Sequence, residues 1–249
     1  MSKYRSAYLA ALIFCCFSLS QVGAQQLAPP SPPDKKQVGE QTPAPTQNAR
    51  FEEWGDLFDD NQLDVSKWEP FSFQGVGGGK VKVEQGELRM RGMHESRFGV
   101  RSRKSFTSDR FIVEGTIKKV SPSLPAPGEQ GLPLGSAVLN IMFDGSGRNR
   151  IEWLLTSEGT FQAWSIIDGV GERLDNRNLA TKIKQPTLAI VRRGDEFLFV
   201  INAPGQPADA AQVALTKSIK NMPRSFRVML YGFSSSENNW DSVRVVTTK

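Results

Sequence analysis

The chain has 249 residues, of which 39% are hydrophobic and 23% are charged, and its formal net charge is +5. Both cysteines, Cys15 and Cys16, lie in the first 24 residues, so the rest of the chain has none for disulfides, thiolate metal ligands or a cysteine nucleophile. The positive charge is spread without a run of Lys or Arg, and no nucleic-acid recognition motif accompanies it. We therefore expect no nucleic-acid partner.

Residues 1–24 have the pattern of a secretory signal peptide. A short basic start is followed by an apolar stretch from Tyr8 to Phe17, and small residues precede a cleavage site after Ala24. The apolar stretch is short for a membrane span. We therefore expect a secreted protein, periplasmic or extracellular, without a membrane span after cleavage, and a retained anchor is the alternative.

Residues 25–50 predict a disordered linker. They contain six prolines and no aromatic residue, so they cannot bury enough apolar surface to offset the chain entropy lost on folding. A coil of 26 residues has a root-mean-square span of roughly 30 Å. The remaining residues, 51–249, are long enough for one domain with its own core.

The domain reads as consecutive β-strands. Eight runs alternate in polarity with a period of two, and Gly, Asn, Asp and Pro separate them. Tight turns between consecutive strands predict antiparallel hairpins, and many such strands predict an all-β fold of two packed sheets or a barrel. One segment, Ala208–Ile219, is the single candidate for a helix. The expected strands are Glu87–Met93, Asp109–Val120, Ser136–Phe143, Asn149–Thr156, Thr160–Ile167, Thr187–Arg193, Glu196–Asn202 and Ser225–Phe233.

Three segments together resemble a known superfamily. The start of the domain reads "FEEWGDLFDDNQLDVSKWEP" and is followed by "GKVKVEQGELRM", and its end reads "NNWDSVRVV". This order is similar to that of concanavalin A-like lectin and glucanase domains. The resemblance implies a two-sheet antiparallel jelly roll, with the first and last strands adjacent and ligands lying across the concave sheet.

The glucanases of this superfamily carry a strand "E-x-D-x-(x)-E", and the order of segments matches it to residues 149–158. Counting from Glu152, the next two positions on the same face are Leu154 and Thr156, so the helper Asp and the second Glu are missing. Glu158 has the same parity as Glu152, but six residues of strand span roughly 20 Å. Retaining hydrolysis requires carboxyl groups about 5 Å apart and inverting hydrolysis requires less than about 10 Å. The resemblance therefore implies a member without this catalytic pair.

A carboxylate from another strand is the alternative partner for Glu152. Glu114 is the best candidate, because it too lies opposite the apolar set of its own strand. If the protein is an enzyme, Glu152 and Glu114 are its expected acids, and it is a glycoside hydrolase or a relative of the keto-disaccharide hydrolase-like domains. His94, the single histidine, lies in a polar segment and is expected to be a solvated surface residue.

The polar parity of the strands predicts a binding surface. An aromatic ring can cover the apolar face of a sugar, while Arg, Asn, Gln and Glu bond its hydroxyl groups. Trp164 is the preferred aromatic residue, although either Trp153 or Trp164 could instead lie in the core. The candidate ligand-binding residues are Asn140, Arg150, Glu152, Gln162, Trp164, Arg227 and Tyr231.

A structural Ca²⁺ is a further expectation from the resemblance, where a terminal-strand Asp and backbone carbonyls meet. Asp241 and the Gly86 carbonyl have matching positions, and hard oxygen ligands suit Ca²⁺. A separate group can either bind a cation or simply cap a turn, and it comprises Asp59, Asp60, Asn61 and Asp64.

The sequence thus favours a lectin-like module that binds carbohydrate or a cell-surface glycan without catalysis. The first alternative is a sugar-active hydrolase that uses Glu152. The second is a structural module of the cell envelope without a small-molecule site.

Overall fold

The computed structural model describes residues 50–73, 78–93, 96–123, 134–178, 185–203, 211–233 and 235–248, and for 176–178 the backbone alone. The predicted signal peptide, nearly all of the predicted linker and His94 lie outside these residues. Within them, every regular element is a β-strand except for a single residue of 3-10 geometry at Phe73. This described part contains no helix of the length and apolarity that crosses a bilayer.

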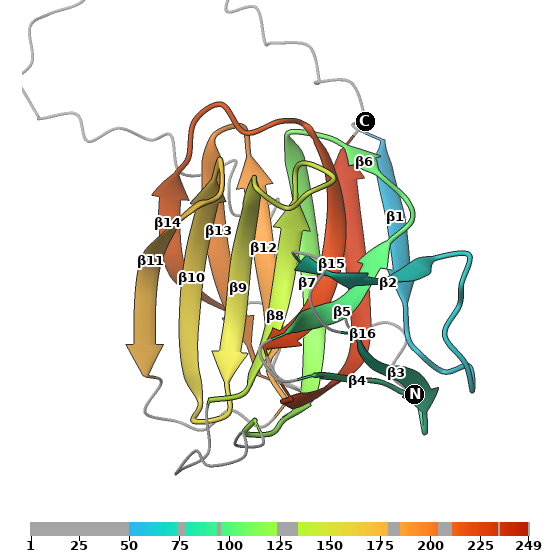
Figure 1. Ribbon diagram of the computed structural model, residues 1–249. Helices are drawn as coiled ribbons and strands as arrows, with labels where there is room; N and C mark the ends of the chain where they lie inside the picture. Colours follow the sequence, from blue (N-terminus) through green and yellow to red (C-terminus); the bar gives the residue numbers. More distant parts are fainter. Residues whose placement is uncertain are drawn as a thin grey trace, which may run out of the picture.

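The strands form two antiparallel sheets that pack face to face (Figure 1). The back sheet contains the first and last strands as neighbours, because β1 (Phe51–Asp56) pairs with β16. Its path runs through β14 (Gln212–Ser218), β13 (Glu196–Asn202), β12 (Thr187–Arg193), β7 (Arg110–Val120), β16 (Glu237–Thr248), β4 (Glu87–Gly92) and β3 (Gly79–Glu84).

The front sheet lies before it in Figure 1, with β9 and β10 in front of β12 and β13. The short strand β6 (Phe106–Thr107) also pairs with β15. The path of the front sheet runs through β11 (Val170–Asn178), β10 (Thr160–Ile167), β9 (Arg150–Thr156), β8 (Ser136–Met142), β15 (Ser225–Phe233), β5 (Arg97–Ser102) and β2 (Trp68–Ser72). This arrangement confirms the all-β, two-sheet antiparallel jelly roll expected from the sequence.

All eight strands predicted from polarity are present, with boundaries within one residue of those expected. The helix considered for Ala208–Ile219 is wrong, because residues 212–218 form β14 at the edge of the back sheet, paired with β13. Ala214 and Leu215 pack against the core from this edge strand. Burial of those two side chains in the sheet outweighs the helical propensity of an Ala-rich sequence.

Alternation along β9 decides which side chains enter the core. Ile151, Trp153 and Leu155 belong to the cluster between the sheets. Trp153 is 1% exposed, and its indole Nε1 donates a hydrogen bond of 3.0 Å to the Val200 carbonyl of the back sheet. The alternate residues, from Arg150 onward, must therefore lie on the outer face of the front sheet.

The outer face of the front sheet is partly covered by apolar side chains. The ring centroid of Phe73 lies 5.3 Å from that of Tyr231, with the planes 69° apart. Phe71 contacts Phe73 in turn, with centroids 5.2 Å apart. The cluster consists of Phe73, Val138, Met142, Leu154, Met229 and Tyr231, with Phe71, Trp164 and Phe233 packed against it. A cavity lies beside this cluster, and its lining comes from β5, β8, β9, β10, β11 and β15.

Candidate functional site

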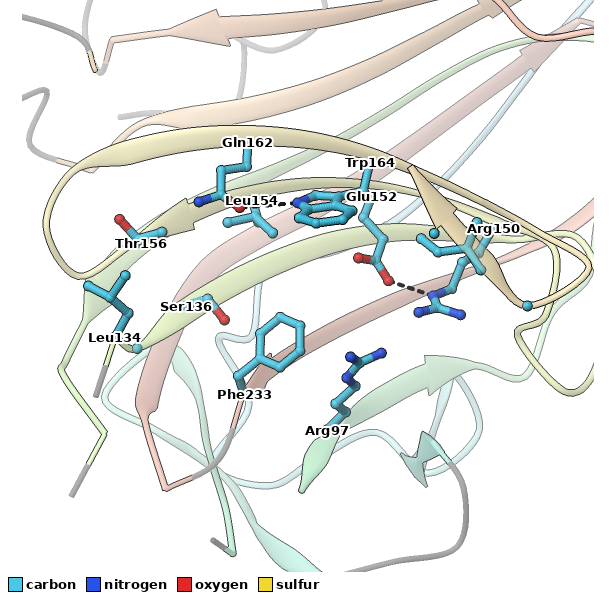
Figure 2. Close-up of a pocket in the computed structure, with 14 residues that line it drawn as sticks. Arg97, Leu134, Ser136, Arg150, Glu152, Leu154, Thr156, Gln162, Trp164 and Phe233 are labelled. Carbon is cyan, nitrogen blue, oxygen red and sulfur yellow. Dashed lines mark hydrogen bonds and ion pairs between the residues drawn. The ribbon is translucent and has the colours of Figure 1, made fainter. Parts of the chain in front are cut away.

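A pocket of about 420 Å³ lies on the outer face of the front sheet, beside the apolar cluster. This volume falls in the range of about 300–1,000 Å³ that is typical of small-molecule sites. Figure 2 shows side chains from β5, β8, β9, β10 and β15 converging on it. Its described lining consists of Arg97, Leu134, Gly135, Ser136, Arg150, Glu152, Leu154, Thr156, Gln162, Trp164, Ile166, Gly169, Gly171 and Phe233.

Strand register brings the polar lining residues together. Trp164 of β10 lies directly opposite Glu152 of β9, and Glu152 lies opposite Asn140 of β8. Directly opposed residues in antiparallel strands have Cβ atoms about 4.5–5.5 Å apart. The three side chains thus form one row across the sheet, as their shared parity predicts.

Glu152 is the centre of a buried polar network. Its Oε1 atom accepts hydrogen bonds from the Arg150 Nε at 2.5 Å, the Tyr231 hydroxyl at 2.7 Å and the Asn140 amide at 3.3 Å. Its Oε2 atom has no hydrogen bond to any part of the chain that the structure describes. Glu152 is 4% exposed and lines the pocket, so this second oxygen is the acceptor that remains for a ligand.

Arg150 is held in place by an ion pair and by a ring. Its Nη1 donates to the Gly147 carbonyl, and its guanidinium carbon lies 4.7 Å from the ring centroid of Phe73. The residue is 8% exposed, and it also lines the pocket. Nε and Nη1 of Arg150 are therefore both used in hydrogen bonds within the protein, whereas its Nη2 has no hydrogen-bond partner among the described residues.

Tyr231 supports the pocket without facing it. It is 0% exposed, because Phe73 packs against it, and its hydroxyl donates a hydrogen bond to Glu152 from β15, on the same face of the sheet. Burial raises the pKa of Tyr231 well above its ordinary value, and the nearby Glu152 carboxylate adds to this rise. The outward parity expected for Tyr231 is present, but the residue would act on a ligand only through Glu152.

Trp164 lies on the outer face, as preferred in the sequence analysis, while Trp153 is in the core. The indole of Trp164 is half-buried, and its Nε1 donates a hydrogen bond of 3.1 Å to the Gln162 side chain. Figure 2 shows the indole next to the Glu152 side chain at the pocket. An aromatic surface and a buried carboxylate therefore share one cavity.

The pairing of Glu152 with Glu114 is wrong, because β7 belongs to the back sheet. Glu114 instead lies 3.3 Å from Nη1 of Arg244, whose Nε donates a hydrogen bond of 2.7 Å to Glu53. Burial raises the pKa of Glu114, and the Arg244 charge opposes that rise. Parity shows that a side chain faces away from the core, but it does not show which sheet carries it.

Arg227 lies on the same sheet face as Glu152, but away from the pocket. Its Nη1 is 3.1 Å from Glu69, whose pKa is lowered chiefly by its hydrogen bonds from Arg101. In the register, Glu69 is separated from Glu152 by four strand spacings, through Asn140, Met229 and Arg101. Four spacings amount to roughly 19 Å, which is too far for the two carboxylates to act on one bond.

The residues considered for calcium do not form a cluster of acids. The Oδ1 atom of Asp241 is 3.0 Å from the Lys118 ammonium, and Gly86 lies in the turn between β3 and β4. In the other group, Asp64 accepts hydrogen bonds from the backbone amide and the hydroxyl of Ser66, as a turn-capping residue does. No three acidic, His or Cys side chains gather as a metal site within the described residues.

Of the fourteen described lining residues, four were predicted from the sequence, namely Arg150, Glu152, Gln162 and Trp164, and ten were not. Phe233 and Ile166 share the parity of Tyr231 and Trp164, so alternation alone identifies them. Arg97 and Leu134 have no such signal. Arg97 belongs to β5, which the polarity pattern did not predict, and Leu134 lies just before the first residue of β8.

The two antiparallel sheets form a concanavalin A-like jelly-roll fold, and solved structures share this fold. The β-glucanase of Bacillus licheniformis is 13% identical, with 79% of this chain and 98% of that chain covered and a TM-score of 0.56.

Two further structures extend the comparison. A non-specific endo-β-1,3(4)-glucanase of family GH16 is 13% identical, with 80% of this chain and 92% of that chain covered and a TM-score of 0.58. The κ-carrageenase of Pseudoalteromonas carrageenovora is 14% identical, with 85% and 100% covered and a TM-score of 0.54. No family model and no curated protein matches the chain. These likenesses establish the fold.

Proposed function

We propose that the pocket binds carbohydrate and does not cleave it. The observation that carries this proposal is the row of Trp164 and Glu152 at the pocket, with Arg150 beside Glu152. An indole supplies a surface for the apolar face of a sugar ring, and the carboxylate and guanidinium supply directed acceptors and donors for its hydroxyls.

The carboxylates near the pocket count against cleavage. Glu152 is the one acid among the described lining residues, and the next two outer-face positions of β9 are Leu154 and Thr156. Glycoside hydrolysis in its common forms needs two carboxyl groups within about 10 Å of each other. Glu69 is roughly 19 Å away by strand spacing, and Glu114 lies on the other sheet.

Binding to a panel of neutral and acidic polysaccharides tests the proposal. We expect wild-type protein to bind at least one of them and Trp164→Ala to bind it at least about tenfold more weakly, since ring stacking and burial contribute about 1.5 kcal/mol or more. Ile167→Ala is the matched control, because Ile167 lies on the same strand, is 37% exposed and does not line the pocket. A folded Trp164→Ala protein with unchanged affinity would remove this site.

A sugar-active hydrolase is the second candidate, and the fold similarity to enzymes named as glucanases favours it. In that case Glu152 would be one of the two acids, with its partner on a neighbouring strand. Release of reducing ends from β-glucans by wild-type protein, abolished in Glu152→Gln, would establish the hydrolase. We expect no such turnover.

Two expectations from the sequence accompany the proposal. Export through residues 1–24 would place the module outside the cytoplasm, where polysaccharides are found, and amino-terminal sequencing of the mature protein tests cleavage after Ala24. Ca²⁺ at Asp241 and the Gly86 carbonyl would raise the melting temperature when the ion is added and lower it when a chelator removes it. A protein that binds no saccharide at all would favour a structural role in the cell envelope.

A further inference from the structure

The charges at the pocket are unequal. Its described lining has two guanidinium groups, those of Arg97 and Arg150, and one carboxylate, that of Glu152. Arg150 pairs with Glu152 at 2.5 Å. Arg97 has no ion pair with any described residue, and its guanidinium carbon lies 4.9 Å from the ring centroid of Phe233. The pocket therefore has one positive charge in excess.

The two arginines are arranged as a pair. Figure 2 shows the guanidinium of Arg97 directed toward that of Arg150 across the pocket. Among the described residues, no group accepts a hydrogen bond from Arg97, and Arg150 keeps Nη2, since its Nε and Nη1 are bonded to Glu152 and Gly147. The charge of Arg150 is balanced by Glu152, whereas Arg97 is exposed and unbalanced among the described residues, so an anion between them would gain the charge of Arg97 and a donor from Arg150.

The excess of positive charge continues along the same face. Arg101, Arg103 and Arg227 lie 2.6, 3.5 and 3.1 Å from Glu69, which is a single carboxylate for three cations. Arg101, Arg227 and Asp144 line a second depression, of about 390 Å³. The three arginines thus meet two carboxylates, Glu69 and Asp144, so a ligand with repeated negative charges would find one positive charge in excess near this depression as well.

We propose that the saccharide bound in the pocket is acidic, and that its anionic group lies between Arg97 and Arg150. This proposal rests on the carbohydrate-binding function proposed above. Trp164 and Arg150 are diagonal neighbours across β9 and β10, about 7–8 Å apart. One acidic sugar can therefore place its ring on the indole and its charge at the arginines. A uronate and a sulfate ester share this chemistry, because both accept paired hydrogen bonds from a guanidinium.

Affinity measurements on the full chain test the proposal with three probes: a neutral β-glucan, a polyuronate and a sulfated galactan. We expect at least one acidic probe to bind tighter than the neutral one, with an affinity that falls as salt is added. Arg97→Gln should weaken binding of that probe by about tenfold or more, as expected for loss of a charge-assisted hydrogen bond. Arg97→Lys should have an intermediate effect, because it keeps the charge and loses the planar donor pair.

The control is Arg224→Gln, which removes the same charge from a residue that pairs with Asp109 and does not line the pocket. It should leave all three affinities unchanged. Equal binding of neutral and acidic probes, unaffected by Arg97→Gln, would overturn the acidic specificity and leave the carbohydrate-binding function standing. Binding of none of the probes would overturn both. The two acidic probes separate carboxylate from sulfate recognition.

Discussion

Tyr231 gives a direct spectroscopic test of the buried network beneath the pocket. The sequence has three tyrosines, and the other two, Tyr4 and Tyr8, lie in the predicted signal peptide. A chain that begins at Gln25 therefore contains Tyr231 alone. This side chain is 0% exposed, and its hydroxyl lies 2.7 Å from Oε1 of Glu152.

Raising the pH should unfold the protein before it ionises Tyr231. Burial and the Glu152 carboxylate raise the pKa of Tyr231 well above 10 in the folded state. The hydroxyl group of a tyrosine in an unfolded chain loses its proton at a pH of about 10. Above that pH the unfolded state binds fewer protons than the folded state, so the free energy of unfolding falls as pH rises. The contribution of this one group is about 1.4 kcal/mol per pH unit.

The assay follows tyrosinate absorbance and far-ultraviolet circular dichroism in one alkaline titration. We expect the two signals to change together in a single transition above pH of about 10. Tyr231→Phe should show no tyrosinate signal and a shallower loss of stability with pH. Ionisation near the ordinary tyrosine pKa with an unchanged dichroism spectrum would refute the buried hydrogen bond to Glu152.

Three other substitutions test the packing and charge of the fold. Glu152→Ala leaves the Arg150 guanidinium buried without its counter-ion, and should lower the free energy of unfolding in urea by about 3–5 kcal/mol. A loss below about 1 kcal/mol, which is typical of a surface ion pair, would contradict the burial of this pair. Gly99→Ala places a Cβ 2.0 Å from the Leu230 carbonyl oxygen, so we expect a loss of about 3 kcal/mol or more in the same measurement. Gly78→Ala, which meets nothing within 4 Å, is its control and should be nearly neutral. Burial raises the pKa of Glu114 in the folded state. Above pH of about 4.3 the unfolded state therefore releases a proton that the folded state still binds, so the free energy of unfolding falls as pH rises. Glu114→Gln should therefore flatten the pH dependence of the unfolding free energy above pH of about 4, and an unchanged profile would argue against this role.

Alternation of polarity predicts most of the strands because each buries one face. The strand β9 shows this best, since Ile151, Trp153 and Leu155 enter the core and the residues between them do not. The strand β11 was missed for the same reason. It is an edge strand of sequence "VGERLDNRN", in which Leu174 is the one described side chain that packs against the core, so no period of two is visible.

The site was less predictable, because it depends on contacts between distant segments. Parity correctly placed Tyr231 on the outer face, but it could not show that Phe73, more than 150 residues earlier, covers it. Parity likewise gave Glu114 an outward direction without assigning it to the back sheet. Local periodicity fixes the face of a strand, whereas the pairing of strands fixes which faces meet.

The aromatic cover also limits the size of the ligand. An uncovered sheet face could bind a polysaccharide chain across all of its strands, but Phe71, Phe73 and Tyr231 cover part of this face. The pocket that remains has a volume of about 420 Å³, which is near the lower end of the range typical of small-molecule sites. We therefore expect a short oligosaccharide to bind the pocket nearly as tightly, per binding site, as the polymer from which it is cut. Calorimetry with oligosaccharides of increasing length measures this, and an affinity that keeps rising with length would show that the ligand crosses the aromatic cluster to the arginines around Glu69.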